Sequence, residues 1–227
     1  LNNGCSASSL VTIDNKSKVW KGTNSNDWND PNNWLPVGVP DPTTCVIIPD
    51  VTSTNYSNIG GAGYDAFGRT LQVIDGGTLT INPTNTVTIT DFVEVRGATS
   101  TFNIENSASL IQVNNVANIG NVNSKRIAVT NSTLDYVYWS TPVAGFSVNN
   151  ITPSSTYRYA WSPTTVTGYA SNFGNWTAAS GAMTTGRGYI IRGSSGNTTF
   201  AGVPNNGNIT IPISRSTYTG VPYAGPT

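Results

Sequence analysis

The chain has 227 residues, of which 10% are charged, and its eleven basic residues balance its eleven acidic ones. This charge content is far below the roughly 25% of an average globular domain and untypical of cytosolic enzymes, and the absence of a Lys- and Arg-rich cluster argues against a nucleic-acid partner. There is no histidine and no acidic residue after Asp135, which excludes carboxylate- or imidazole-based catalysis from the segment 136–227.

The composition favours short β-strands joined by polar turns. Asn supplies 28 residues, Gly another 23, and Ser and Thr are abundant. This pattern is typical of extracellular β-structure. No apolar run approaches the length of about 18 residues that a membrane span requires, so we expect no membrane span in this segment.

The two cysteines, Cys5 and Cys45, predict one disulfide that ties the N-terminal arm to the first folded segment. In the loop-entropy model such a bond contributes roughly 4 kcal/mol. The alternative is two free, partly buried thiols.

Three tryptophans follow within fifteen residues, Trp20, Trp28 and Trp34, separated by Asn and Asp turns. They form either a small core that caps one end of a β-domain or a surface on which sugars stack. In the same stretch, carboxylate and amide oxygens are candidate ligands for Ca²⁺, the one cofactor that we consider. These residues are also ordinary turn formers; they are Asp27, Asn29, Asp30 and Asn32.

Residues 71–129 contain short apolar–polar–apolar triplets whose starts are mostly six to nine residues apart. Each triplet predicts one strand with alternating faces. The spacing favours a β-solenoid, in which short strands stack turn upon turn, over an antiparallel meander in a sandwich. The triplets begin at Leu71, Leu79, Val87, Val93, Phe102, Leu110 and Ile127, and a gap around Ile119 leaves room for another strand.

From about Asp135 the predicted strands become longer and aromatic, at 136–139, 157–161, 189–192 and 209–213. We therefore expect an all-β protein: a Trp-capped β-solenoid-like domain at 1–130, then a jelly-roll-like β-sandwich at 131–227. No closing strand is evident at the end, so we expect the segment to belong to a longer protein.

The sequence suggests two further functions for a face of the solenoid. Asp91 and Glu94 are close enough in sequence to form the acid pair of a polysaccharide lyase or hydrolase. The candidates for a basic partner are Arg69, Arg96, Lys125 and Arg126. Scattered charges are equally the ordinary solvated surface of a strand. The Thr-rich triplets at 78–80 and 86–88 could form a flat threonine ladder of the ice-binding type, although Thr is simply a good strand residue.

Several blocks are similar to large secreted cell-surface proteins of Bacteroidota that are exported by the type IX secretion system. The resemblance spans about residues 19–213. Its most specific part is Tyr138-Trp139-Ser140-Thr141-Pro142-Val143, and others are Val19-Trp20-Lys21-Gly22, Asp27-Trp28-Asn29-Asp30-Pro31-Asn32-Asn33-Trp34, Cys45-Val46-Ile47-Ile48-Pro49, Gly76-Gly77-Thr78-Leu79-Thr80-Ile81 and Arg187-Gly188-Tyr189-Ile190. It implies an extracellular, adhesive or scaffolding role, and no site residues come with it.

We therefore expect a non-enzymatic extracellular module that acts in adhesion or as a structural segment of a filament or stalk. Its expected partners are surface glycans or other copies of a surface protein. The first alternative is a carbohydrate-binding module that stacks sugars on Trp28, Trp34, Trp161 and Trp176. The second is a polysaccharide lyase or hydrolase acting on the solenoid face.

Overall fold

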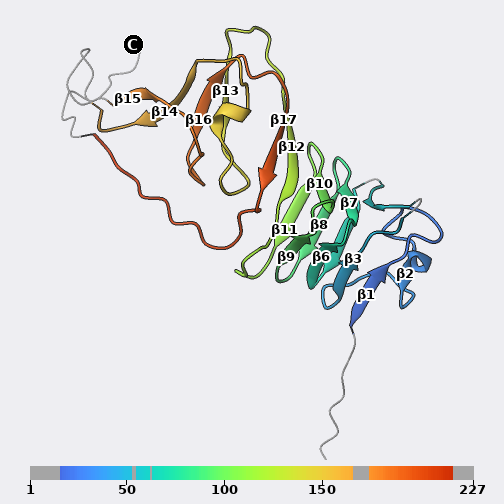
Figure 1. Cartoon of the computed structure of the whole chain (residues 1–227). Helices are drawn as coiled ribbons and strands as arrows, with labels where there is room; N and C mark the ends of the chain where they lie inside the picture. Colours follow the sequence, from blue (N-terminus) through green and yellow to red (C-terminus); the bar gives the residue numbers. More distant parts are fainter. Residues whose placement is uncertain (1–15, 53–54, 62, 166–173, 217–227) are drawn as a thin grey trace, which may run out of the picture.

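The computed structural model describes residues 16–52, 55–61, 63–165 and 174–216. The fold is all-β, as predicted, and its described residues include just two short 3-10 helices, η1 (Pro31–Asn33) and η2 (Val148–Asn150). Figure 1 shows a column of short strands that begins at β1 and ends at β12, with a second group of strands beyond it.

Three sheets build the column, and their strands are parallel except for β2 and β17 at the sheet edges. Sheet A contains β1 (Ser17–Trp20), β2 (Trp34–Leu35), β3 (Cys45–Ile48), β6 (Thr70–Ile74) and β9 (Val93–Arg96). Sheet B contains β4 (Ser57–Ile59), β7 (Thr78–Ile81), β10 (Thr101–Ile104), β12 (Val122–Ala128) and the antiparallel β17 (Gly196–Gly202). Sheet C contains β5 (Asp65–Gly68), β8 (Thr86–Ile89) and β11 (Ser109–Gln112).

The chain visits the three sheets in turn, so each strand pairs in parallel with its equivalent one turn later. Thr101 of β10 lies opposite Thr78 of β7, and Ser109 of β11 lies opposite Thr86 of β8. This is a β-solenoid of about three turns. The preferred solenoid prediction is therefore confirmed, and the antiparallel meander is wrong because these pairs are parallel.

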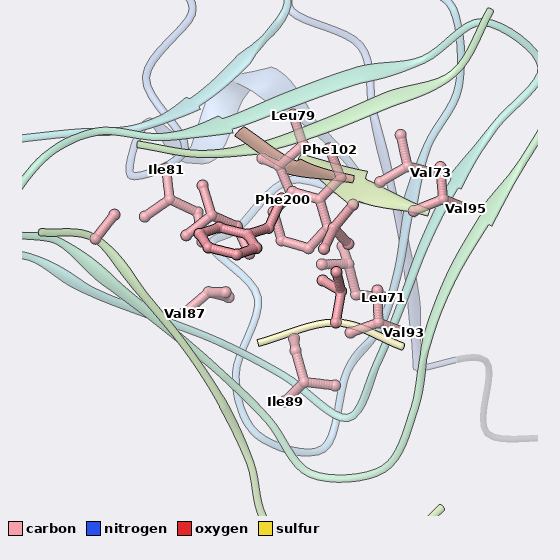
Figure 2. Close-up of a cluster of buried hydrophobic side chains, with 14 of the residues drawn as sticks. Leu71, Val73, Leu79, Ile81, Val87, Ile89, Val93, Val95, Phe102 and Phe200 are labelled. Atoms are coloured by element: carbon pink, nitrogen blue, oxygen red, sulfur yellow. The ribbon is translucent and has the colours of Figure 1, made fainter. Parts of the chain in front are cut away.

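Period-2 alternation fills the solenoid interior. Leu79 and Ile81 of β7 are fully buried, whereas Thr78 and Thr80, which alternate with them, are half-buried on the outer face. Figure 2 shows the inward side chains of successive turns in contact, and burying each one contributes about 1.5–3 kcal/mol. The close stacking needs glycine at position 77, because a Cβ there would lie 2.0 Å from the Ile48 carbonyl oxygen.

The gap around Ile119 contains a fragment of a fourth turn. Ile119 forms an isolated parallel bridge with Glu94 of sheet A, after which β12 continues sheet B. Sheet C ends at β11 within the described residues.

Beyond β12 the chain forms sheet D, which is antiparallel with the order β13-β16-β14-β15. Its strands are β13 (Tyr136–Trp139), β14 (Arg158–Ser162), β15 (Asn175–Ala178) and β16 (Tyr189–Arg192). The sequence predicted β13, β14 and β16 but missed β15. It also predicted a strand at 209–213, where the structure has no strand. In the described part of 131–216, sheet D and β17 are the only strands, so the predicted β-sandwich is not confirmed.

The predicted boundary near residue 130 falls where the chain leaves β12, but the two parts remain joined. β17 returns to pair with β12 through seven residue pairs, from Val122–Gly202 to Ala128–Gly196. Its Phe200 is buried among solenoid side chains, as Figure 2 shows. One hydrophobic cluster thus runs from Trp20 through the solenoid to sheet D.

Candidate functional site

The N-terminal tryptophans close the end of the solenoid and are not exposed. Trp20, Trp28 and Trp34, the tryptophan cap, have exposed fractions of 1%, 0% and 1%. The Trp34 ring packs edge-to-face on the other two, with centroid distances of 5.0 Å and 4.8 Å, and its Nε1 donates to the Trp28 carbonyl. The small-core interpretation is confirmed. Sugar stacking by Trp28 and Trp34 is wrong, because neither ring face is accessible.

The predicted calcium residues stabilise turns. Asp27 Oδ1 accepts the Asn29 N–H at 2.9 Å, and Asp30 Oδ1 accepts the Asn32 N–H at 2.9 Å. The Asn24 amide and the Asn32 N–H lower the pKa of the Asp30 carboxyl. No group of three or more His, Cys, Asp or Glu side chains converges anywhere in the described ranges. Calcium binding by these four residues stays a prediction.

The disulfide also stays a prediction. Cys45 is half-buried at the start of β3 and makes no disulfide with any described residue. Its predicted partner, Cys5, lies outside the described residues.

The two candidate catalytic carboxylates are held by other groups. Asp91 accepts hydrogen bonds from the Asn114 amide at 2.8 Å and from Arg69 at 3.0 Å, and these lower its pKa. Glu94 is buried, and hydrogen bonds from Gln72 and then Arg96 lower its pKa. A general acid requires a raised pKa. Asp91 and Glu94 are therefore both stabilised in the ionised form.

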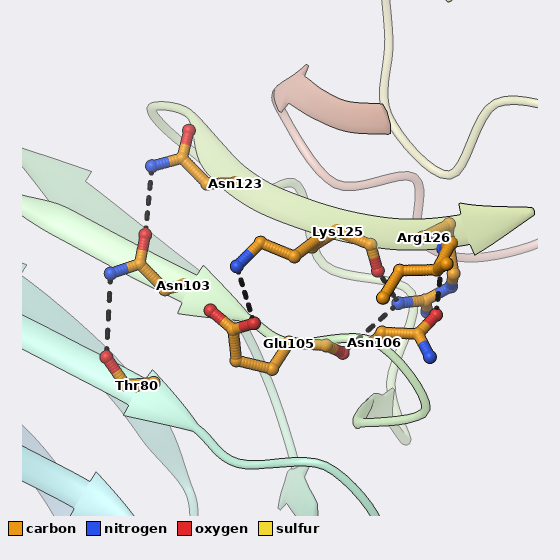
Figure 3. Close-up of polar contacts among 8 residues, drawn as sticks. Thr80, Asn103, Glu105, Asn106, Asn123, Lys125 and Arg126 are labelled. Atoms are coloured by element: carbon orange, nitrogen blue, oxygen red, sulfur yellow. Dashed lines mark hydrogen bonds and ion pairs between the residues drawn. The ribbon is translucent and has the colours of Figure 1, made fainter. Parts of the chain in front are cut away.

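The outer face of sheet B carries a polar ladder, drawn in Figure 3. The Asn123 amide donates to Asn103 Oδ1 at 3.1 Å, and the Asn103 amide reaches Thr80 Oγ1 at 3.5 Å. Thr78 and Thr80 belong to sheet B, whereas Thr86 and Thr88 belong to sheet C. The two Thr triplets lie on different faces and cannot form one flat ladder.

Aromatic rings gather on the open face of sheet D. Strand register places alternate residues of neighbouring strands on this face: Tyr138, Ile190 and Tyr159 lie in one row, and Trp161 lies opposite Trp176. We call the aromatic rings on this side the aromatic face. Their exposed fractions are 43% for Tyr136, 75% for Tyr138, 43% for Tyr157, 44% for Trp161 and 36% for Trp176. Tyr159 also belongs to the aromatic face and is half-buried.

The opposite face of sheet D explains why these rings remain outside. Trp139, Ala160 and Ile191 point the other way and are buried in the core shared with the solenoid. Trp139 packs on Phe200 with ring centroids 5.8 Å apart, and its Nε1 donates to Ser194 Oγ at 2.9 Å. One face of the sheet is thus anchored, and the aromatic face is its solvent side.

Contacts hold several of the exposed rings in place. Trp161 and Trp176 form an edge-to-face pair with centroids 5.3 Å apart, and Tyr136 and Tyr159 are 6.4 Å apart. The Arg192 guanidinium lies 4.2 Å from the centre of the Tyr157 ring, and Arg187 donates to the Trp161 carbonyl. Rigid aromatic rings lose little conformational entropy on binding, so this surface is prepared for contact.

A pocket of about 690 Å³ lies between the last solenoid turn and the segment after β17. Its lining includes Leu110, Val122, Arg126 and Asn205. Several of its polar groups already have protein partners: Asn205 bonds to the Thr141 carbonyl, and Arg126 bonds to backbone carbonyls. Part of the polar lining of the pocket is therefore already occupied by protein groups.

Comparison with protein-family models matches residues 19–227 to a domain of unknown function, DUF8693. The chain belongs to the DUF8693 family. No curated protein and no solved structure matches it. The match covers both the solenoid and sheet D, so this DUF8693 domain includes the tryptophan cap and the aromatic face alike.

Sequence reasoning identified Trp161 and Trp176 of the DUF8693 domain but missed the tyrosines beside them. The signal was present, since aromatics occupy alternate positions at Tyr136 and Tyr138, and again at Tyr157, Tyr159 and Trp161. Alternation places them on one face of each strand. Which face of sheet D is exposed to solvent depends on how Phe200 packs against the other face. The residue pattern of each strand does not reveal that packing.

In the described part of this DUF8693 domain, no helix has the length and apolar character needed to cross a membrane.

Proposed function

We propose that this DUF8693 domain is a non-enzymatic extracellular module that acts in adhesion, with the aromatic face as a carbohydrate-binding surface and the solenoid as its rigid support. The observation that carries the proposal is the Trp161–Trp176 pair, side by side and exposed on an anchored sheet. Contiguous exposed apolar patches mark interaction sites, and Trp, Tyr and Arg dominate binding energy at such sites.

Sugars suit this surface because a pyranose ring has a flat C–H side and a rim of hydroxyls. The rings of Trp161 and Trp176 provide flat apolar contact, and the tyrosine hydroxyls provide donors and acceptors. The resemblance to secreted surface proteins supports an extracellular setting in which glycans are available.

The enzymatic alternative has less support. Asp91 and Glu94 are engaged by Asn114, Gln72 and arginines, and their pKa values are lowered. The aromatic face lies in the segment after Asp135, which has no carboxylate of its own. Binding without cleavage is the behaviour that these groups support.

The proposal is tested by a binding screen against immobilised polysaccharides. We expect retention on at least one of them, and Trp161→Ala should weaken it about tenfold or more, as is typical of an aromatic hot spot. Tyr56→Ala is the matched control, because Tyr56 is 44% exposed on the solenoid, away from sheet D. Loss of a polysaccharide chain's length during incubation would indicate an enzyme and contradict the proposal, as would unchanged retention of the Trp161 variant.

A further inference from the structure

The charged residues within sheet D and in the chain between its strands have one sign. Residues 136–227 contain four arginines and no acidic residue, and Arg158, Arg187 and Arg192 belong to sheet D or its turns. None of these three forms an ion pair within the described residues, where the carboxylates in ion pairs are Asp91, Glu94 and Glu105 of the solenoid. Sheet D therefore has uncompensated positive charge.

Two of these arginines stand at opposite ends of the aromatic face. Arg192 pairs across the strands with Tyr136 and stacks on Tyr157. Arg187 is exposed at the edge of the sheet, where it is bonded to the Trp161 carbonyl and lies 5.8 Å from the centre of the Tyr189 ring. Tyr157 and Trp161 are four residues apart on an extended strand, which separates the two ends by about 14 Å. A ligand that covers the face would meet a guanidinium at each end.

The third arginine is used differently. The Arg158 guanidinium donates to the carbonyls of Thr152 and Pro153 at 2.5 Å and 3.1 Å, and its side chain leaves from the buried side of the sheet. It fixes the loop that follows η2. Arg187 and Arg192 are therefore the arginines available to a ligand.

Stacking on Tyr157 orients the Arg192 guanidinium so that it can bind a planar anion such as a carboxylate. The guanidinium rests on the Tyr157 ring, 4.2 Å from its centre, in a cation–π contact. A stacked guanidinium keeps its N–H groups in the plane, where they can form a fork of two hydrogen bonds with a carboxylate. No hydrogen bond from the Arg192 guanidinium to a described residue occupies that fork.

We propose that the aromatic face binds an acidic polysaccharide whose sugars carry carboxylates, that is, a chain of uronic acids. The rings of Trp161 and Trp176 contact the sugar faces, and Arg192 and Arg187 bind carboxylates along the same chain. The chain after Asp135 contributes no carboxylate that would repel such a ligand, and the Asp135 carboxylate itself accepts the N–H groups of Asn131 and Ser132. This inference rests on the proposed carbohydrate-binding function and specifies its ligand class.

The test compares two polyuronates, poly-mannuronate and polygalacturonate, with their carboxyl-reduced neutral counterparts, using affinity electrophoresis of the full chain. We expect at least one polyuronate to bind about tenfold more tightly than its neutral counterpart, because charge-assisted hydrogen bonds to arginine are the strong ones. Arg192→Gln and Arg187→Gln should each reduce this preference while leaving binding to the neutral polymer unchanged. Lys21→Gln, which removes an exposed charge at the opposite end of the solenoid, should leave the preference intact.

The possible results distinguish a failure of the uronate inference from a failure of the carbohydrate-binding proposal. Equal binding of polyuronates and neutral polymers would overturn the uronate inference and leave the carbohydrate-binding proposal standing. Binding of none of these or any other polysaccharide would overturn both. Equal binding of polyglutamate, an anion without sugar, would overturn the inference by showing attraction to charge alone. Arg192→Lys keeps the charge but not the fork, so a full polyuronate preference in that variant would contradict the role of the fork.

Discussion

Phe200 of β17 packs against Phe146 with ring centroids 4.6 Å apart, inside the same cluster as the solenoid side chains. Phe200 enters from the strand that returns to pair with β12, and Phe146 comes from the loop that follows sheet D's first strand. The solenoid end is therefore closed by residues that belong, in sequence, to the second half of the chain. We infer that the two halves stabilise each other.

Phe200→Ala should lower the free energy of unfolding by about 3–5 kcal/mol, because Phe200 is 1% exposed and its loss leaves a cavity. Chemical denaturation followed by circular dichroism measures the change. Thr199→Ala, at the exposed neighbouring position on the same strand, is the control and should be nearly neutral. An unfolding midpoint equal to that of the control would mean that β17 does not close the core.

Trp34→Ala should be equally costly, about 3–5 kcal/mol, because Trp34 is the central ring of the tryptophan cap. The control is Leu35→Ala, one residue further along β2, whose side chain is 55% exposed. Thermal unfolding of both variants provides the comparison. If they melt at the same temperature, the three tryptophans are not a structural cap.

The solenoid could be predicted from the sequence because its signal is local. Inward residues such as Leu79 and Ile81 alternate with outward Thr, and parallel stacking repeats that pattern turn by turn. The pairing of β17 with β12 could not be predicted in this way, since it joins Val122 to Gly202 across most of the second half. The predicted sandwich is not confirmed, since β17 pairs with sheet B and does not belong to a second sheet beside sheet D.

The residues around each tryptophan in the sequence also did not predict which tryptophans are buried. Trp28 and Trp34 have neighbours as polar as those of Trp161 and Trp176, yet the first two are buried and the second two exposed. The difference arises from position in the fold. An open solenoid end must be covered, whereas a single antiparallel sheet can leave one face in solvent.

Acidification should destabilise the protein partly through Glu94. Hydrogen bonds from Gln72 and Arg96 keep the folded-state pKa of Glu94 below its ordinary value of 4.5. Its stabilising contribution is therefore complete above about pH 4.5 and is lost as the pH falls through the lower folded-state pKa. Melting temperatures from pH 7 to pH 2 should fall less steeply for Glu94→Gln than for the wild type. Parallel curves for the two proteins would contradict this assignment.

The central claim is that the aromatic face is the contact surface for polysaccharide, and fluorescence quenching tests it most directly. Trp161 and Trp176 are exposed, whereas Trp20, Trp28, Trp34 and Trp139 are at most 8% exposed, so acrylamide quenching reports mainly on the exposed pair. The measurement uses a polysaccharide that the binding screen retains, added to saturation. We predict that it lowers quenching in the wild type and has no effect in the Trp161→Phe/Trp176→Phe double variant. Saturating polysaccharide that leaves wild-type quenching unchanged would place binding elsewhere and contradict the account.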